Sequence, residues 1–159
     1  MKRKKIDLSE ERKILTHMIV DTMFLKHLKD IIRPELFESS YCRIIASWIT
    51  EYFEHTEEAP SRNIQSIFLS KKSKIMSEED SEMIADLLTD LSQDWESASV
   101  HNHTYSEKQA VDYFKIRSLE NRKSKIELAI STKDPQKGEH LITEYKRVEK
   151  PTGEGLNLF

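Results

Sequence analysis

Apolar residues recur at helical spacing along nearly the whole chain, and polar residues fill the positions between them. The clearest stretch begins after Ser39 or Ser40, where apolar residues follow the i, i+3, i+4, i+7 spacing of one helix face. This face comprises Tyr41, Ile44, Ile45, Trp48, Ile49, Tyr52 and Phe53. We expect this helix to form the centre of a core in which Trp48 is buried.

Shorter stretches with the same spacing lie on both sides of this segment. Each begins at a residue that commonly caps a helix, or at a proline. We place these starts at Asp7 or Ser9, Asp21, Pro60 and Ser77. Together the segments predict a helical head over residues 9–96.

The second half of the chain predicts a different arrangement. A long helix is expected over about residues 105–131. Asp134-Pro135 then restarts the chain as a helix to about Val148, since proline is favoured at the first helical position. Because two helices joined by about three residues form an antiparallel pair, we predict a helical hairpin over residues 105–148.

The apolar residues of the long helix lie near its two ends, and Leu119 is the one apolar residue between Arg117 and Lys125. A helix of about 27 residues is roughly 40 Å long, which is more than the head needs for its own covering. The shorter returning helix cannot shelter all of these side chains. We therefore expect a surface that faces another protomer, formed by Val111, Phe114, Leu119, Ile126, Ile130 and Tyr145. The alternative is that the hairpin folds back and its apolar ends complete the core of the head.

Three further segments lack this periodicity. Residues 1–8 contain Lys2-Arg3-Lys4-Lys5 and are interpreted as a basic N-terminal arm. Residues 97–104 are small and polar and predict a connection between head and hairpin. Residues 149–159 contain one proline and two glycines and are interpreted as a linker tail.

Composition narrows the fold class. Three glycines and four prolines supply few turns, which argues against many short strands and favours an all-α fold. The scarcity of glycine also excludes phosphate-binding loops of the G-x-x-x-x-G-K-[ST] and G-x-G-x-x-G types. The formal net charge of −3 argues against binding nucleic acid by bulk electrostatics.

The single cysteine and the lack of long apolar runs indicate the cellular compartment of the protein. The single Cys42 excludes an intramolecular disulfide, which fits a reducing environment. No apolar run approaches the ~18 residues that span a bilayer. The basic start is not followed by the apolar stretch of a signal peptide. We expect a cytoplasmic protein without membrane contact.

His101-Asn102-His103 raises two hypotheses about chemistry. Two imidazoles one residue apart can share a metal ion, but no cysteine or acidic residue lies at a supporting spacing. The tripeptide also matches the name of the HNH nucleases, whose strand-like context this pattern lacks. We interpret it as a polar loop, and we expect no catalytic residue, no metal and no cofactor.

Charge is distributed unevenly along the chain. Between Ile75 and Glu107 there is no Lys or Arg, whereas residues 108–147 carry ten basic residues. The acidic segment 78–96 is either a solvated helix face or a docking surface for a basic partner.

Several short segments match a known helical domain at core and turn positions. They are Glu11-Arg12-Lys13-Ile14-Leu15, Ile32-Arg33-Pro34-Glu35-Leu36-Phe37, Tyr41-Cys42-Arg43-Ile44-Ile45 with Trp48 and Tyr52-Phe53, Ala59-Pro60, Tyr113-Phe114, and Glu139-His140-Leu141-Ile142-Thr143-Glu144-Tyr145. In these segments the chain resembles the N-terminal domain of DnaB-type replicative DNA helicases, particularly the branch found in phages. The resemblance covers most of residues 10–148 and includes no catalytic signature.

The resemblance implies a hairpin that pairs between protomers, as a dimer or as a trimer of dimers that forms the collar of a hexamer. It also implies contact with primase or a helicase loader during DNA replication, with DNA bound only weakly or indirectly. The ATPase domain of such helicases is missing, and the tail at 151–159 favours a fragment over a free-standing relative. The competing hypothesis is a free-standing phage accessory protein that binds single-stranded DNA or modulates a replication protein in trans.

Overall fold

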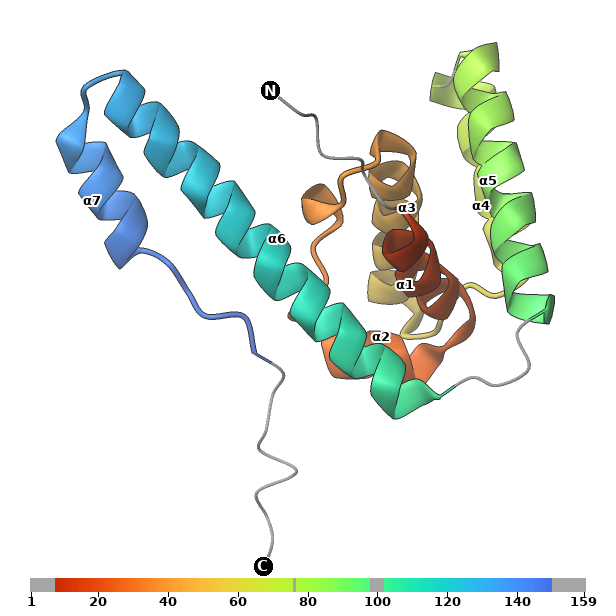
Figure 1. Cartoon of the computed structure of the whole chain (residues 1–159). Helices are drawn as coiled ribbons and strands as arrows, with labels where there is room; N and C mark the ends of the chain where they lie inside the picture. The colour runs from red at the N-terminus through yellow and green to blue at the C-terminus, as the bar shows by residue number, and fades with distance from the viewer. Residues whose placement is uncertain (1–7, 76, 98–101, 150–159) are drawn as a thin grey trace, which may run out of the picture.

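The computed structural model describes residues 8–75, 77–97 and 102–149 (Figure 1). Over these ranges the chain forms seven α-helices, one short 3-10 helix and no strand, which confirms the predicted all-α class. The helices are α1 Ser9–Val20, α2 Thr22–Leu28, the 3-10 helix η1 Pro34–Leu36, α3 Ser40–Thr56, α4 Asn63–Ile75, α5 Glu78–Ser97, α6 His103–Ser131 and α7 Pro135–Thr143.

Side-chain caps start α2 and α7 where the sequence predicts them. The carboxylate of Asp21 accepts a hydrogen bond of 3.1 Å from the backbone amide of Phe24 at the start of α2. Asp134 accepts one of the same length from Lys137 and is followed by the proline that begins α7. Such caps satisfy amides that have no partner within the helix. They are local features, so a single sequence reveals them.

Two other predicted helix starts are wrong. The N-cap of α1 is Leu8, with no side-chain hydrogen bond, and α4 begins at Asn63, three residues after Pro60.

The core of the head lies where α1, α2 and α3 meet. Helix α3 is central as predicted, and Ile45, Ala46 and Ile49 are completely buried. Trp48 is only 8% exposed, and its ring lies 6.4 Å from that of Phe68 in α4, measured between centroids. The prediction that Trp48 belongs to the core is therefore confirmed.

The first half of α6 completes this core. Ala110 and Phe114 are completely buried, and the ring of Phe114 meets that of Phe37 edge-on at 5.5 Å between centroids. The expectation that Phe114 faces another protomer is therefore wrong, because the head itself supplies its apolar surroundings. The first half of α6 therefore follows the alternative prediction, in which apolar residues of the hairpin complete the core of the head.

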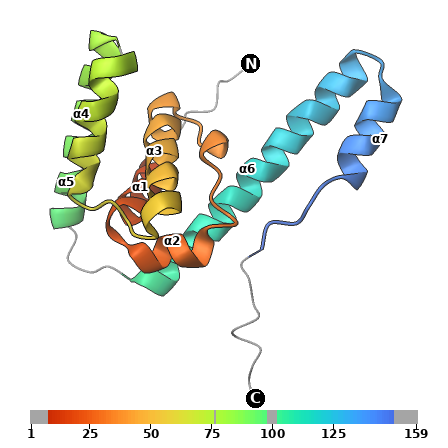
Figure 2. The ribbon, with the colours of Figure 1, turned by 180° about the vertical axis from the view of Figure 1, so that it is seen from behind.

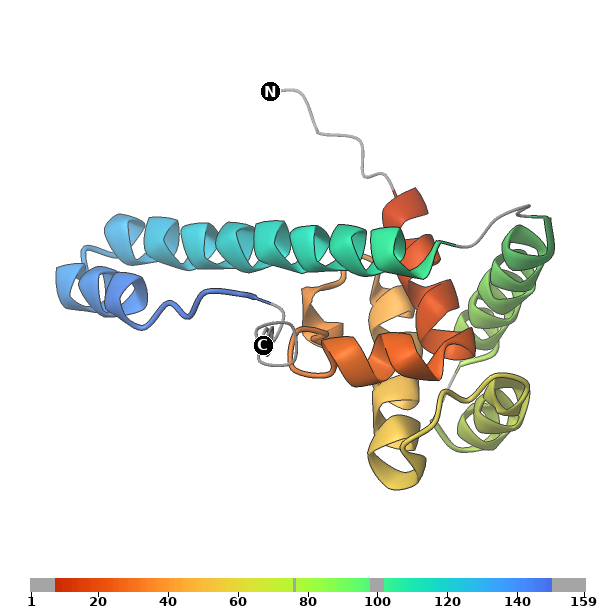
Figure 3. The same cartoon turned by 90° about the horizontal axis from the view of Figure 1, so that it is seen from below.

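The second half of α6 leaves the head and projects away from it, with α7 antiparallel beside its far end (Figures 1 and 3). Leu141 of α7 and Ala129 of α6 are buried between the two helices. The predicted hairpin thus divides into an inner part, which belongs to the head, and an outer part.

Helix α7 ends at Thr143, well before Val148, so the prediction of a helix to about Val148 is wrong. The chain continues without helical structure to Glu149 and runs back from α7 towards the head (Figure 2). Val148 is buried there as part of the hydrophobic core. An extended segment advances about 3.3 Å per residue against about 1.5 Å in a helix, which lets Val148 reach the head.

Most of the predicted arm at 1–8 and most of the tail at 149–159 lie outside the described residues, as do residues 98–101 of the predicted connection. In the described part of the chain, no helix is both long and apolar enough to cross a membrane.

Candidate protein-interaction surface

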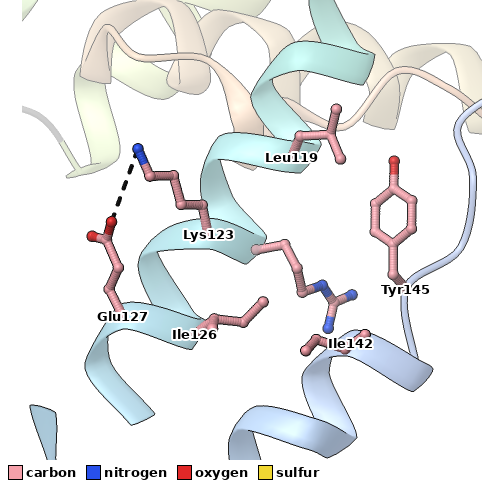
Figure 4. A pocket seen from close by; sticks show the side chains of 7 residues that line it. Leu119, Lys123, Ile126, Glu127, Ile142 and Tyr145 are labelled. Carbon is pink, nitrogen blue, oxygen red and sulfur yellow. Dashed lines mark ion pairs between the residues drawn. The ribbon is translucent and has the colours of Figure 1, made fainter. Parts of the chain in front are cut away.

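The outer part of the hairpin contains an apolar groove between α6 and α7 (Figure 4). Its volume is about 350 Å³, and it is open to solvent. The side chains that line it are Leu119, Arg122, Lys123, Ile126, Glu127, Ile142 and Tyr145. Both helices and the segment after α7 therefore contribute to one surface.

Helical spacing places the α6 part of this surface on one side of the helix. Leu119, Ile126 and Ile130 are separated by seven and four residues, so their side chains lie nearly in line. Helix α7 packs close to this line because small residues meet at the contact. A Cβ atom added at Gly138 would lie 3.7 Å from the Cβ of Ala129.

Large apolar side chains on this surface are exposed. The exposed fraction is 52% for Leu119, 61% for Ile142 and 70% for Ile130. Ile116, three residues before Leu119, is 57% exposed and extends the surface towards the head. We call Ile116, Leu119, Ile126, Ile130 and Ile142 the hairpin face. A cluster of exposed apolar side chains of this kind is typical of an interaction site.

Charges of both signs border the hairpin face. Lys123 Nζ lies 3.9 Å from Glu127 Oε1, one helical turn further along α6 (Figure 4). The guanidinium of Arg122 lies over the ring of Tyr145, 5.9 Å from its centroid. With Arg122 and Lys123 against Glu127, the described residues that line the groove carry a net charge of +1.

The structure separates the six residues predicted for the interface. Leu119, Ile126 and Tyr145 come together in the groove, and Ile130 lies one turn beyond Ile126 on the same side of α6. Val111 is only half-exposed and packs against the core of the head. With Phe114 in that core as well, the inner end of α6 contributes no side chain to the groove.

Ile116 and Ile142 belong to the hairpin face although they were not among the residues predicted for the interface. Both lie in apolar stretches that the pattern identifies as helical. In α7, Leu141 is buried and its neighbour Ile142 is exposed. Which of two adjacent apolar residues points inward depends on the rotation of α7 against α6, and the short α7 pattern does not fix that rotation.

A buried polar junction fixes the place where α6 leaves the head. Glu11 of α1 is 1% exposed, and its carboxylate accepts hydrogen bonds from the backbone amides of Glu38 at 2.6 Å and Ser39 at 3.2 Å. The hydroxyl of Tyr113 in α6 donates a third hydrogen bond to it. Burial, and next the hydrogen bond to the Glu11 carboxylate, raise the pKa of Tyr113 well above its ordinary value. The phenol therefore remains a donor at all physiological pH values.

Arg117 strengthens the same junction one turn further along α6. Its Nε donates to the backbone oxygen of Leu36 at 2.6 Å, and its Nη1 lies 3.2 Å from a carboxylate oxygen of Glu38. The junction thus ties α1, the segment before α3 and α6 together. The junction was not predicted, although Glu11, three residues before Ile14 on the inward-facing side of α1, is a signal that could reveal it.

Within the described ranges, no three His, Cys, Asp or Glu side chains lie close enough to hold a metal ion. Asn102 caps α6 by accepting a hydrogen bond of 3.0 Å from the amide of Tyr105, so the helix begins two residues earlier than predicted, whereas His101 lies outside the described residues. Burial raises the pKa of the Cys42 thiol to about 11, which keeps it protonated and unreactive at neutral pH.

In comparisons with known proteins, no family model, no curated protein and no solved structure matches the chain. The fold and the surface therefore define its class: an all-α molecule with a helical head and a projecting hairpin whose exposed face suits contact with another protein.

Proposed function

We propose that this chain is a non-catalytic oligomerisation and partner-docking domain of a DnaB-like replicative DNA helicase. The hairpin face carries the proposal, because it presents large apolar side chains on an arm that projects from the head. Pairing of two hairpins through these faces would remove this apolar area from water. Such pairs are the units of a hexameric collar, and the heads then remain accessible to primase or a helicase loader.

The buried junction supports the same proposal. Glu11 and Tyr113 belong to separate segments of the resemblance to helicase N-terminal domains, as do Phe37 and Phe114, and in the fold each pair is in contact. These contacts hold the hairpin at a fixed angle to the head. A collar built from paired hairpins needs such an angle, because the angle sets how the heads are arranged.

Light scattering with Leu119→Asp tests the proposal. The parent chain is expected to form at least a dimer at tens of micromolar, and the variant is expected to be monomeric, because pairing would bury an unpaired charge. Leu128→Asp is the matched control, since Leu128 is 59% exposed on the opposite side of the same helix. Circular dichroism should show the same helical content for all three proteins.

A parent chain that is monomeric at these concentrations, or a Leu119→Asp variant that still associates, would refute pairing through the hairpin face. Binding to single-stranded DNA separates the proposal from the competing accessory protein. We expect weak or no binding by the isolated chain. Tight binding that weakens steeply with salt would favour the accessory protein instead.

A further inference from the structure

A second and larger groove lies on the head, on a different surface from the hairpin face. It has a volume of about 910 Å³ and lies between α1, α4 and α5. Its apolar lining includes Ile19 from α1, Ile64, Phe68 and Leu69 from α4, and Leu88 and Leu91 from α5. Helices α4 and α5 form one edge of the head in every view, away from the hairpin (Figures 1 and 2).

The walls of this groove combine buried and exposed apolar groups. Ile64 and Phe68 are almost completely buried, and Leu69 beside them is 62% exposed. On α5, Leu88 is half-buried while Leu91 is 2% exposed. An apolar groove between two helices, with depth at its base and an exposed apolar rim, is the shape that receives the apolar side of a third helix.

The acidic side chains of α5 indicate which charge a helix bound in this groove should carry. The helix carries eight acidic residues and no Lys, Arg or His. Arg12 lies 3.9 Å from Asp90 and 2.8 Å from Asp94, and Asp80 accepts a hydrogen bond from Tyr41. The other five have no cationic partner among the described residues: Glu78, Glu79, Glu82, Asp86 and Glu96.

Two of these five carboxylates border the groove. Arg62, just before α4, is the one cation among the described residues of the lining. On α5, Glu96 is part of the lining, and Glu82 lies three residues before Ala85, another lining residue, on the same side of the helix. Both are exposed. The five carboxylates of α5 without a cationic partner among the described residues outnumber Arg62. An occupant that placed further carboxylates or phosphates against α5 would therefore be repelled, which disfavours nucleic acid and anionic membrane surfaces.

We propose that this groove binds an amphipathic helix of a partner protein, in which Lys or Arg residues flank apolar residues at i, i+3, i+4 and i+7. The apolar residues enter between α4 and α5, and the basic residues meet the carboxylates on α5. The inference rests on the partner-docking part of the proposed function and adds where the partner binds and what its binding segment looks like. It does not depend on pairing through the hairpin face.

Selection from a displayed library of helical peptides tests the proposal. Leucine is fixed at i, i+3, i+4 and i+7, and the other positions vary among Lys, Arg, Glu, Gln and Ala. Peptides that bind the full chain are expected to be enriched in Lys and Arg. Their affinity should fall with rising salt and fall at least about tenfold for Leu69→Asp, which places a charge on the apolar rim. Leu128→Asp, equally exposed but on the hairpin, should bind as the parent does.

Several outcomes would overturn the proposal. They are the absence of enriched peptides, enrichment of acidic or neutral peptides, and enriched peptides that Leu69→Asp does not weaken. A change in the mass of the chain caused by Leu69→Asp would mean that a second copy occupies the groove, which also contradicts it. Because Leu69→Asp leaves the hairpin face intact, loss of peptide binding and loss of self-association are distinguishable.

Discussion

A carboxylate inside a protein needs hydrogen-bond donors around it, and Glu11 has three. Two are backbone amides that precede α3, and the third is the Tyr113 hydroxyl. The side chain therefore satisfies backbone groups that the turn before α3 leaves without helical partners. It also joins this turn to α6. Glu11 is thus one of the residues that fix how the head and the hairpin meet, together with Arg117 and the contact between Phe37 and Phe114.

Removal of one of these donors should weaken the fold measurably. We expect Tyr113→Phe to lower the free energy of unfolding by about 1–3 kcal/mol, because it removes one of the three donors to a buried carboxylate. Glu11→Ala should cost more, since it leaves the amides of Glu38 and Ser39 unsatisfied as well. Urea unfolding followed by circular dichroism measures both. Tyr105→Phe is the control, because Tyr105 is 58% exposed, and its effect should stay within about 0.5 kcal/mol. Equal stability of Tyr113→Phe and the parent would contradict the role of the junction.

At the scale of secondary structure, the outer hairpin depends on a close approach between α6 and α7. Gly138 and Ala129 face each other there, and both are buried. Helix α7 has only nine residues, too few for stability in isolation. Its packing on α6 must therefore supply most of its stability, and the residue at position 138 affects both helix propensity and packing.

Gly138→Ala is expected to stabilise the chain by about 0.5–1 kcal/mol, since alanine favours a helix over glycine. The added Cβ would lie 3.7 Å from Ala129, an ordinary contact distance. Gly138→Leu should destabilise instead, because a larger side chain forces α7 away from α6. Thermal unfolding compares the two variants with the parent. A lower midpoint for Gly138→Ala would show that the two helices lie closer than this structure has them.

Local and tertiary signals differ in how much of this fold they predict. The caps at Asp21 and Asp134 depend on two or three adjacent residues, so the starts of α2 and α7 were predictable. The division of α6 was not, because Phe114 and Leu119 are both large apolar residues of the same helix, and nothing in their own segment says which of them meets the head. Phe37, which is distant in sequence, makes one of them a core residue and leaves the other on the surface. The end of α7 was missed for a similar reason, since Val148 contributes to a core that its own segment does not reveal.

At the scale of the whole molecule, the head and the outer hairpin are stabilised unequally. The head has a continuous core of buried residues from α1, α2, α3 and the inner half of α6. The outer hairpin buries little beyond Ala129, Gly138 and Leu141. Regions with few buried apolar contacts open before the rest of a protein does. The outer hairpin should therefore be the first part to open unless a partner covers it.

Hydrogen exchange tests both the difference in stability between the head and the outer hairpin and the proposed pairing through the hairpin face. Backbone amides of α1 and α3 should exchange slowest, and those of α7 fastest, in dilute protein. If the hairpin face pairs, protection of α7 should rise with protein concentration in the parent and stay constant in Leu119→Asp, since binding stabilises the bound state by mass action. Protection of α7 that is independent of concentration in a chain that forms dimers would mean that another surface mediates association.

The unbroken course of α6 gives the molecule a mechanical property. One helix of 29 residues, about 43 Å long, begins in the core of the head and ends in the hairpin. The part of α6 beyond the Glu11 junction is about 20 Å long. A rotation of α6 by about 10° at this junction would therefore move the outer end of the helix by about 3.5 Å. If two copies pair through the hairpin face, as proposed, substitutions at the Glu11 junction would thus change the geometry of the pair without altering any residue of that face.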